Sequence, residues 1–152
     1  MSDQSPHDGG CIFCRIIAGE IPCQKIIENQ NILCFLDIGP VVVGHSLVIP
    51  KRHIRNIFDM PAHVAADLGH ELPALARAIC AAVQAPACHI LLNNGIEAMQ
   101  SVHHAHYHII PRKTDDSFFV PWQPGKLEMR EAQSLIGKIQ KNYENVDNGL
   151  RP

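Results

Sequence analysis

The sequence contains no uninterrupted apolar run that approaches the roughly 18 residues needed to cross a bilayer. Residues 1–10 are polar and lack the apolar segment of a secretory signal peptide. These two absences argue against a membrane span and against export. We therefore expect a cytoplasmic protein with no membrane partner.

An excess of charge of either sign is also missing. The 152 residues include 13 Lys and Arg against 15 Asp and Glu, a formal net charge of -2. No basic stripe favours binding to a long nucleic acid, whereas a small nucleotide needs only a local site. There are no internal repeats and no low-complexity segments. The hydrophobic content of 46% suffices for the core of one domain, and two domains are not expected.

A cytoplasmic chain keeps its thiols reduced, so the six cysteines do not indicate a disulfide framework. Four of them are interpreted as small buried hydrophobic residues: Cys23, Cys34, Cys80 and Cys88. The Cys11-x-x-Cys14 pair has the spacing of half a zinc site. The alternative is a thioredoxin-like redox pair, but that requires a preceding strand, and only ten polar residues come before Cys11.

Periodicity and turn residues predict an α+β domain over residues 11–145, between a disordered tail (1–10) and a C-terminal tail (146–152). Two amphipathic helices are expected, a long one that opens at Pro61 and ends at Pro86, and one over 127–143. The remaining predicted elements are a short helix over 12–18 ended by Gly19, a hairpin of strands 25–28 and 32–37, a strand over 41–49 ended by Pro50, and strands 89–92 and 104–110.

Three histidines at two-residue spacing form the most informative pattern: His104, His106 and His108. A strand repeats every two residues, so the three imidazoles would project from one face of the predicted strand 104–110. Such a wall can supply a nucleophile, a proton donor and a metal ligand. A plain metal-binding cluster, or coincidence in a chain with 10 histidines, is the simpler alternative.

The residues around these histidines resemble the histidine triad family of nucleotide hydrolases and transferases. The segment from Asn93-Asn94-Gly95 through Gln100-Ser101 to His108 is similar to the family signature. Three upstream segments match the family in order: Cys11 to Pro22, as in bacterial members, Phe35-Leu36-Asp37-Ile38, and Gly44 to His53. The resemblance implies an antiparallel sheet with one long helix packed on it. It also implies a homodimer formed through that helix and a sheet continued across subunits.

The resemblance implies that His106 attacks the α-phosphorus of a nucleotide and forms a nucleotidyl-histidine that water then hydrolyses. His108 is expected to contact phosphate oxygens, and Ser101 and Asn93 to donate hydrogen bonds to the phosphate or the leaving group, with Gln100 nearby. A buried core histidine is the alternative for His106. Ordinary turn chemistry is the alternative for the Asn93 segment.

Asp37 follows a β-rich run and can accept hydrogen bonds from both ribose hydroxyls, although a turn at the strand end also uses Asp. By resemblance, apolar positions form a pocket for the base, and core packing is the alternative for each. They are Ile12, Phe13, Ile16, Leu36 and Ile38. The expected partner is therefore a purine nucleotide with an AMP moiety.

Some relatives close a four-ligand zinc site with residues that correspond here to Cys11, Cys14, His53 and His104, and His45 is the competing ligand. Four protein ligands leave no open position, so this zinc would be structural, and no catalytic metal is expected. Three differences from the family bear on substrate preference: Leu36 replaces a polar residue, Ala98-Met99 replaces a glycine-rich pair, and His103 adds an imidazole of opposite strand parity.

Hydrolysis of adenosine phosphoramidates or diadenosine polyphosphates is the leading hypothesis. Nucleotidyl transfer is the first alternative, although the branch of the family that transfers uridylyl groups carries Gln where this chain has His108. A zinc-stabilised nucleotide-binding or interaction module with little turnover is the second.

Overall fold

The computed structural model describes residues 10–114, 116 and 123–147, and these fall into two compact units, 1–118 and 119–152. The predicted N-terminal tail, apart from Gly10, and residues 148–152 of the predicted C-terminal tail lie outside the described residues. Within the described part of the chain, no helix has the length and apolar character that a bilayer span requires.

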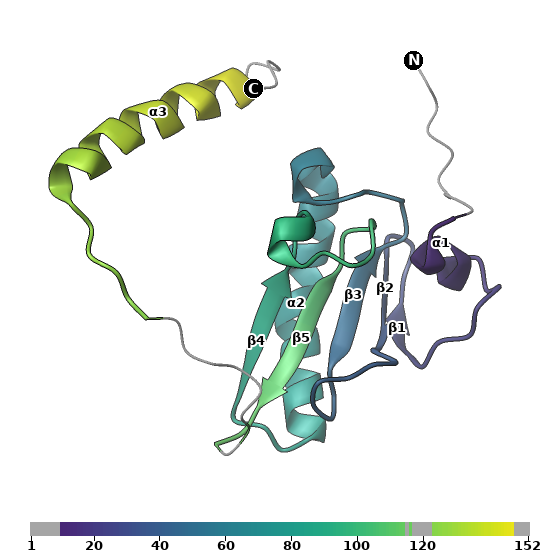
Figure 1. The fold of residues 1–152 in the computed structure, drawn as a ribbon. Helices are drawn as coiled ribbons and strands as arrows, with labels where there is room; N and C mark the ends of the chain where they lie inside the picture. The colour runs from purple at the N-terminus through teal and green to yellow at the C-terminus, as the bar shows by residue number, and fades with distance from the viewer. Residues whose placement is uncertain (1–9, 115, 117–122, 148–152) are drawn as a thin grey trace, which may run out of the picture. The chain divides into compact units, whose positions relative to one another are not determined.

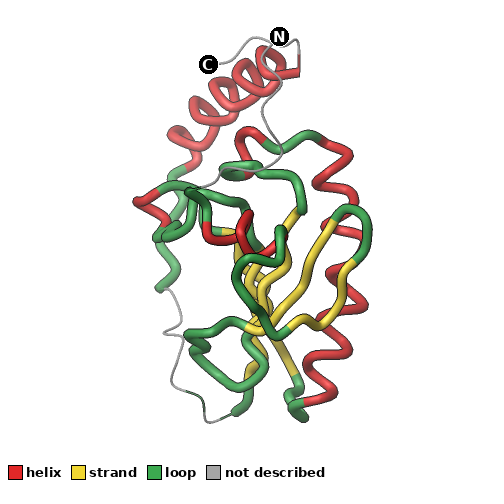
Figure 2. The backbone as a smooth tube through the Cα atoms, turned by 90° about the vertical axis from the view of Figure 1, so that its right-hand side faces the viewer, coloured by secondary structure: helices red, strands yellow, loops and turns green. Residues whose placement is uncertain are grey.

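The first unit is built on a five-stranded antiparallel sheet in the order β1-β2-β3-β5-β4 (Figure 1). The strands are β1 (Lys25–Glu28), β2 (Ile32–Leu36), β3 (Ser46–Pro50), β4 (Ala87–Leu92) and β5 (Tyr107–Arg112). The long helix α2 (Ala62–Ala82) contacts β3, β4 and β5 and runs along one side of the sheet (Figure 2). This is the α+β architecture that the sequence predicts.

Both faces of the central strands are covered. In β2, Ile32 and Cys34 belong to the core shared with α2, whereas Leu33 and Phe35 belong to a second core with the short helix α1 (Ile12–Ile17). Alternate residues of a strand point to opposite faces, so one strand serves two cores. The second core includes Phe13 and Cys14 of α1, and it therefore places the N-terminal segment beside the sheet.

The helices and the hairpin agree with the sequence predictions, with shifted boundaries. Helix α1 ends before Gly19, whose φ of +78° suits a glycine, and the β1–β2 hairpin forms as predicted. Helix α2 ends at Ala82 rather than at Pro86, because Gln84 adopts a left-handed conformation with φ of 55°. In the second unit, α3 (Met129–Asp147) starts and ends later than the predicted 127–143.

Three strand predictions need correction. The strand predicted over 41–49 starts only at Ser46, since the chain turns through Gly44, whose φ is +88°. Strand β4 starts at Ala87 instead of residue 89, and β5 starts at Tyr107 instead of residue 104. The β5 ladder cannot start earlier because the backbone N–H of Ala105 donates to the carbonyl oxygen of Ile54, 2.6 Å away, outside the sheet.

The prediction for the cysteines is partly wrong. Cys34 is fully buried, and burial raises the pKa of its thiol to about 12, as expected for a small hydrophobic residue. Cys23, Cys80 and Cys88 are only half-buried, and none of the six cysteines forms a disulfide. Two short 3-10 helices, Ile57–Asp59 and Ile96–Ala98, complete the elements of the described chain.

Candidate active site and metal centre

The three histidines of the repeat do not share one strand face, because only His108 belongs to β5. The repeat nevertheless brings His106 and His108 together, with ring centroids 4.9 Å apart. The ring of His104 turns elsewhere and lies 5.1 Å from the ring of His53. The repeat thus divides into two parts: His106 and His108 lie together, and His104 lies with the other candidate metal ligands.

His106 has the arrangement that a nucleophilic imidazole needs. Its Nδ1 donates to the backbone carbonyl oxygen of His104 at 2.6 Å, so the lone pair of the ring is on Nε2. Burial lowers the pKa of His106 below the ordinary histidine value, which keeps the ring neutral. The edge contact with Phe13, at 5.2 Å between ring centroids, further fixes the ring. Carbonyl, burial and aromatic contact together present a neutral Nε2.

A chain of hydrogen bonds fixes the protons on His45 and His108. The backbone N–H of Val41 donates to His45 Nδ1 at 3.3 Å, so the proton of a neutral His45 ring is on Nε2. His45 Nε2 lies 2.9 Å from His108 Nδ1 and donates to it. His108 therefore carries its own proton on Nε2, as a donor suited to an oxygen of a phosphate.

Burial is the main reason why the imidazole rings of His45 and His108 stay neutral. It lowers the pKa of His108 to about 4, with further lowering by His106 and His45, and it also lowers the pKa of His45. The sequence reasoning considered His45 only as a competing metal ligand. Its position next to Gly44 in a matched segment was the available signal for a place in the active site.

Asp37 follows β2 directly and serves two neighbours at once. Its Oδ1 accepts from the backbone N–H of Gly39 at 2.8 Å, which is the turn role considered from the sequence. Its Oδ2 lies 3.6 Å from His45 Nε2. The turn thus holds one carboxylate oxygen, and the other faces the histidines.

Asp37, His45 and His108 also place one possible ligand atom each within 4.8 Å of one another. A metal bound there would need the lone pair of His45 Nε2. The Val41 amide opposes this, because it places the proton of a neutral ring on Nε2. The three residues are therefore better suited to hydrogen bonding than to metal binding.

The loop before the triad is held by Gln100, which is buried. Its Oε1 accepts from Gly95 N at 2.9 Å, and its Nε2 donates to the carbonyl oxygens of Arg55 and Val102. Asn93 lies on the same loop and donates weakly to Met99 O at 3.5 Å, while Ser101 is exposed. Gln100 therefore holds the conformation of the loop through backbone groups, whereas the Ser101 side chain faces solvent.

The residues expected to form the base pocket differ in how much of their surface is exposed to solvent. Phe13 is buried against Phe35 and the histidine rings, which is core packing. Ile16 is half-buried, and the other three are exposed: Ile12, Leu36 and Ile38. These three can offer apolar surface to a planar base, and Asp37 lies between the last two in sequence.

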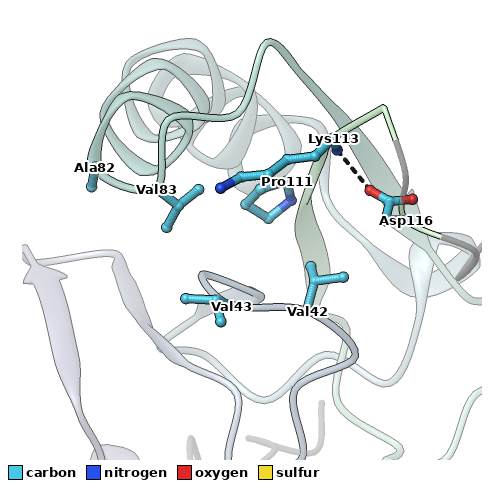
Figure 3. A pocket seen from close by; sticks show the side chains of 7 residues that line it. All are labelled: Val42, Val43, Ala82, Val83, Pro111, Lys113 and Asp116. Carbon is cyan, nitrogen blue, oxygen red and sulfur yellow. Dashed lines mark hydrogen bonds between the residues drawn. The ribbon is translucent and has the colours of Figure 1, made fainter.

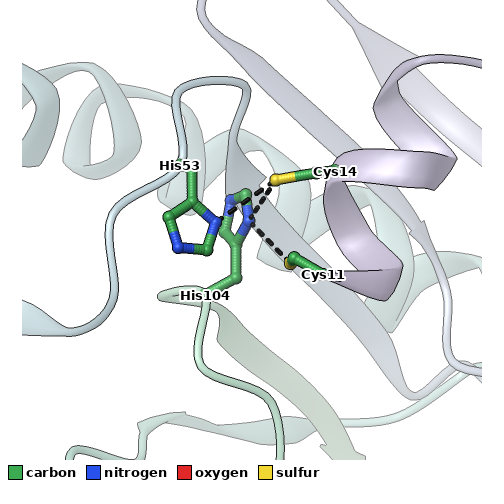
Figure 4. A group of neighbouring side chains, drawn as sticks. All are labelled: Cys11, Cys14, His53 and His104. Carbon is green, nitrogen blue, oxygen red and sulfur yellow. Dashed lines mark hydrogen bonds between the residues drawn. The ribbon is translucent and has the colours of Figure 1, made fainter. Parts of the chain in front are cut away.

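The four predicted metal ligands come together from three parts of the chain (Figure 4). Cys14 Sγ lies 3.2 Å from His53 Nδ1 and 3.6 Å from His104 Nδ1, and Cys11 Sγ lies 3.5 Å from His104 Nδ1. In a tetrahedral zinc site, metal bond lengths place neighbouring sulfur and nitrogen ligands about 3.6 Å apart. The separations therefore fit zinc without a large movement.

The protons at this centre also suit a metal. His104 Nε2 donates to the carbonyl oxygen of Pro50 at 2.9 Å, which leaves the Nδ1 lone pair facing both cysteine sulfurs. Burial lowers the pKa of His104 to about 4, so the ring is neutral. His45 is not in this group; its Nε2 faces His108 and Asp37 instead. Four protein ligands would hold a closed, structural ion.

A family model for the HIT domain matches residues 18–115, well over half of the chain. The chain belongs to the HIT domain family. Its similarity to curated members extends over most of its length: 46% identity over 134 residues with Protein hit of Bacillus subtilis, covering 86% of this chain and 92% of that protein. With the adenosine 5′-monophosphoramidase HNT1 of Saccharomyces cerevisiae it shares 36% over 148 residues, covering 97% and 91%.

The HIT fold is also seen in solved structures. SMU.412c from Streptococcus mutans superposes with a TM-score of 0.88 at 38% identity, covering 93% of this chain and 90% of that chain. The antiparallel sheet with its packed long helix is therefore the fold that the sequence resemblance implies.

This HIT domain has a further hollow of about 350 Å³ at the C-terminal end of β5 (Figure 3). Its lining is mostly aliphatic: Val42, Val43, Ala82, Val83, Pro111, Lys113 and Asp116. None of these lining residues is a candidate catalytic residue.

Proposed function

We propose that this HIT protein hydrolyses nucleoside 5′-phosphate derivatives at the α-phosphorus through a nucleotidyl intermediate on His106. The observation that carries the proposal is the hydrogen bond from His106 Nδ1 to the His104 carbonyl, which leaves Nε2 free beside His108. An imidazole fixed in this way needs no base to deprotonate it before it attacks phosphorus.

Binding would use the exposed apolar side chains Ile12, Leu36 and Ile38 for the base, and Asp37 for the ribose hydroxyls. The Oδ2 of Asp37 faces the histidines, so a ribose bound there would place its 5′-phosphate near His106. His108 Nε2–H, Ser101 and Asn93 are the donors for phosphate oxygens, and Gln100 shapes the loop that carries two of them.

In the first step, the His106 Nε2 lone pair forms a bond to the α-phosphorus. The bond from phosphorus to the leaving group breaks, and the leaving group takes the electron pair and a proton from solvent. In the second step, water attacks the same phosphorus and releases a proton to solvent, His106 departs with its electron pair, and the nucleoside monophosphate is released. Zinc, when bound, supplies only a cross-link between α1, His53 and His104.

Adenosine phosphoramidates and diadenosine polyphosphates are the candidate substrates. The adenosine 5′-monophosphoramidase activity in the name of the yeast relative supports the first class.

The homodimer and the cytoplasmic location stay predictions. Strand β4 is at the edge of the sheet, with Ile90 exposed, and could continue the sheet across subunits. Sedimentation of the full chain tests whether the homodimer forms.

The deciding experiment traps the intermediate. Wild-type protein is quenched in alkali during turnover of an α-³²P-labelled adenosine phosphoramidate, and the label is mapped by peptide analysis. We expect label on His106. His106→Ala should lose it and lower kcat by on the order of 10³-fold or more, while nucleotide binding measured by calorimetry persists. His103→Ala, an exposed neighbour, is the matched control.

Label on another residue, or near-normal turnover by His106→Ala, contradicts the assignment. Binding without turnover in the wild-type protein would favour the interaction module. Formation of a nucleotide–sugar product when a sugar phosphate is added would favour the transferase.

A further inference from the structure

Helix α3 carries a seam of apolar residues at alternating spacings of three and four. The seam residues are Met129, Ala132, Ile136, Ile139, Tyr143 and Val146. All except Ala132 have more than half of their surface exposed. In heptad notation they occupy every a and d position from Met129 onward, and this period of 3.5 is typical of a helix that packs against another helix.

The flanking residues fit a helical partner of the same sequence. The charged residues of α3, apart from Asp147, lie at the outer positions b, c and f: Arg130, Glu131, Lys138, Lys141 and Glu144. The positions beside the seam are otherwise uncharged: Gln133, Leu135, Gln140 and Asn142. Two identical helices can therefore approach along the seam without repulsion between like charges.

The sizes of the seam side chains distinguish a parallel from an antiparallel pair of α3 helices. In a parallel pair each residue meets its own copy, so two Tyr143 rings crowd one layer and two Ala132 methyl groups underfill another. In an antiparallel pair an a residue faces a d residue, and the layers become Met129 with Val146, Ala132 with Tyr143, and Ile136 with Ile139. Large then faces small, and the layers have similar volumes.

Electrostatics favours the same direction. Glu144 and Asp147 lie near the C-terminal end of α3, where the helix dipole is already negative, and no basic residue occupies the last turn. An antiparallel partner brings the positive end of its helix dipole to this end, and Arg130 and Glu131 in its first turn cancel in charge.

We propose that α3 pairs antiparallel with the α3 of a second copy of this chain. The contact is isologous, with a two-fold axis that crosses the helices between residues 137 and 138. It is independent of the proposed phosphoryl chemistry. A helix of 19 residues is short, so the pairing is expected in the full-length protein, where any other contact between copies raises the effective concentration of the helices.

Disulfide trapping in the full chain tests the pairing. Protein with Ile136→Cys is mixed with protein with Ile139→Cys, oxidised gently, and the linked peptides are identified by mass spectrometry. We expect mainly the mixed 136–139 disulfide between copies. The matched control is Ser134→Cys mixed with Lys141→Cys, two outer positions that lie symmetrically about the proposed axis, and it should form little mixed disulfide.

Mainly 136–136 and 139–139 disulfides would mean a parallel pair and would overturn the proposal. Disulfides from α3 to the native cysteines at 11–88, or none between copies, would overturn it as well. A second arm needs no thiol: Tyr143→Ala should weaken association in sedimentation, and Ala132→Tyr combined with Tyr143→Ala should restore it. A double variant no better than Tyr143→Ala would contradict the Ala132–Tyr143 layer.

Discussion

At the scale of single residues, the chemistry of this HIT domain depends on which ring nitrogen of each histidine carries the proton. Backbone groups decide this for His104, His106 and His45, through the carbonyls of Pro50 and His104 and the amide of Val41. The backbone is fixed by the fold, so each ring offers one defined nitrogen: His104 Nδ1 faces the cysteine sulfurs, His106 Nε2 keeps its lone pair, and His45 Nε2 donates to His108.

The ribose assignment leads to a prediction about Asp37. A 2′,3′-dideoxy substrate lacks the two ribose hydroxyls that would donate to Asp37 Oδ2. Compared with the ribose substrate, its kcat/KM with the wild-type protein should be lower by the equivalent of about 1–3 kcal/mol. Asp37→Asn should narrow the difference between ribose and dideoxyribose substrates, and Asp59→Asn, at the exposed end of a 3-10 helix, should not. An equal difference in wild type and Asp37→Asn would leave Asp37 with only its turn role.

The neutral state of His108 predicts a pH dependence of stability. Its native pKa of about 4 is below the unfolded value of about 6.5, so the unfolded chain binds more protons between these limits. The contribution of His108 is therefore complete above about pH 6.5 and decreases as the pH falls toward 4. Urea unfolding of zinc-saturated protein measures this. Between pH 6.5 and 4, the free energy of unfolding should decrease less for His108→Gln than for the wild type.

The exposed His63 on α2 provides the control, and His63→Gln should follow the wild type. If His108→Gln shows the same acid dependence as the wild type, the ring is not kept neutral by burial.

At the scale of elements, Gly44 lets the loop before β3 approach two other elements. A Cβ built on Gly44 would lie 2.9 Å from Val83 Cγ1, after α2, and 3.2 Å from Pro111 Cγ, in β5. Its φ of +88° is also unfavourable for other residues. This close approach sets the path of the chain into His45, the next residue.

Gly44→Ala should therefore lower the free energy of unfolding by about 2–4 kcal/mol, from backbone strain plus overpacking. Gly19→Ala is a control for the strain alone, since its φ is +78° but nothing lies within 4 Å of a built Cβ. It should cost about 1 kcal/mol. Denaturant unfolding of both variants measures the difference, and equal losses would remove the packing argument for Gly44.

At the scale of the whole molecule, the metal centre joins parts of the chain that are distant in sequence. Cys11 and Cys14 come from the N-terminal segment, His53 follows β3, and His104 precedes β5. An ion bound there stabilises only the folded chain, because the unfolded chain does not bring the ligands together.

We expect close to one zinc per chain in protein purified without chelator. Chelation should lower stability by about 3 kcal/mol or more, the value for a ligand at 100 times its Kd, and Tm by roughly 6–12 °C. Cys14→Ser should act likewise, whereas Cys23→Ser, outside the group, should change Tm little. Zinc-free purified protein with freely titratable Cys11 and Cys14 would remove the site.

Much of this architecture could be predicted from local patterns. The short apolar runs of β2 and β3, the apolar stripe of α2, and Gly19 at the end of α1 are local signals that tertiary packing did not override. The boundaries that failed, at Ser46 and Tyr107, depend on distant partners. Gly44 meets Val83 and Pro111, and the Ala105 amide meets the Ile54 carbonyl, and neither contact leaves a local pattern.

The same division holds for the candidate site. The sequence by itself determined which side chains are available: the histidine repeat, the cysteine pair, Asp37, and by resemblance the family. Only the tertiary structure decided that His104 turns to Cys11 and Cys14, that Phe13 is buried against His106, and that His45 joins His108. The physical reason is that residue type and spacing are local. Burial and the backbone groups that orient each imidazole come from segments up to 93 positions away, which meet only when the sheet and α1 have packed.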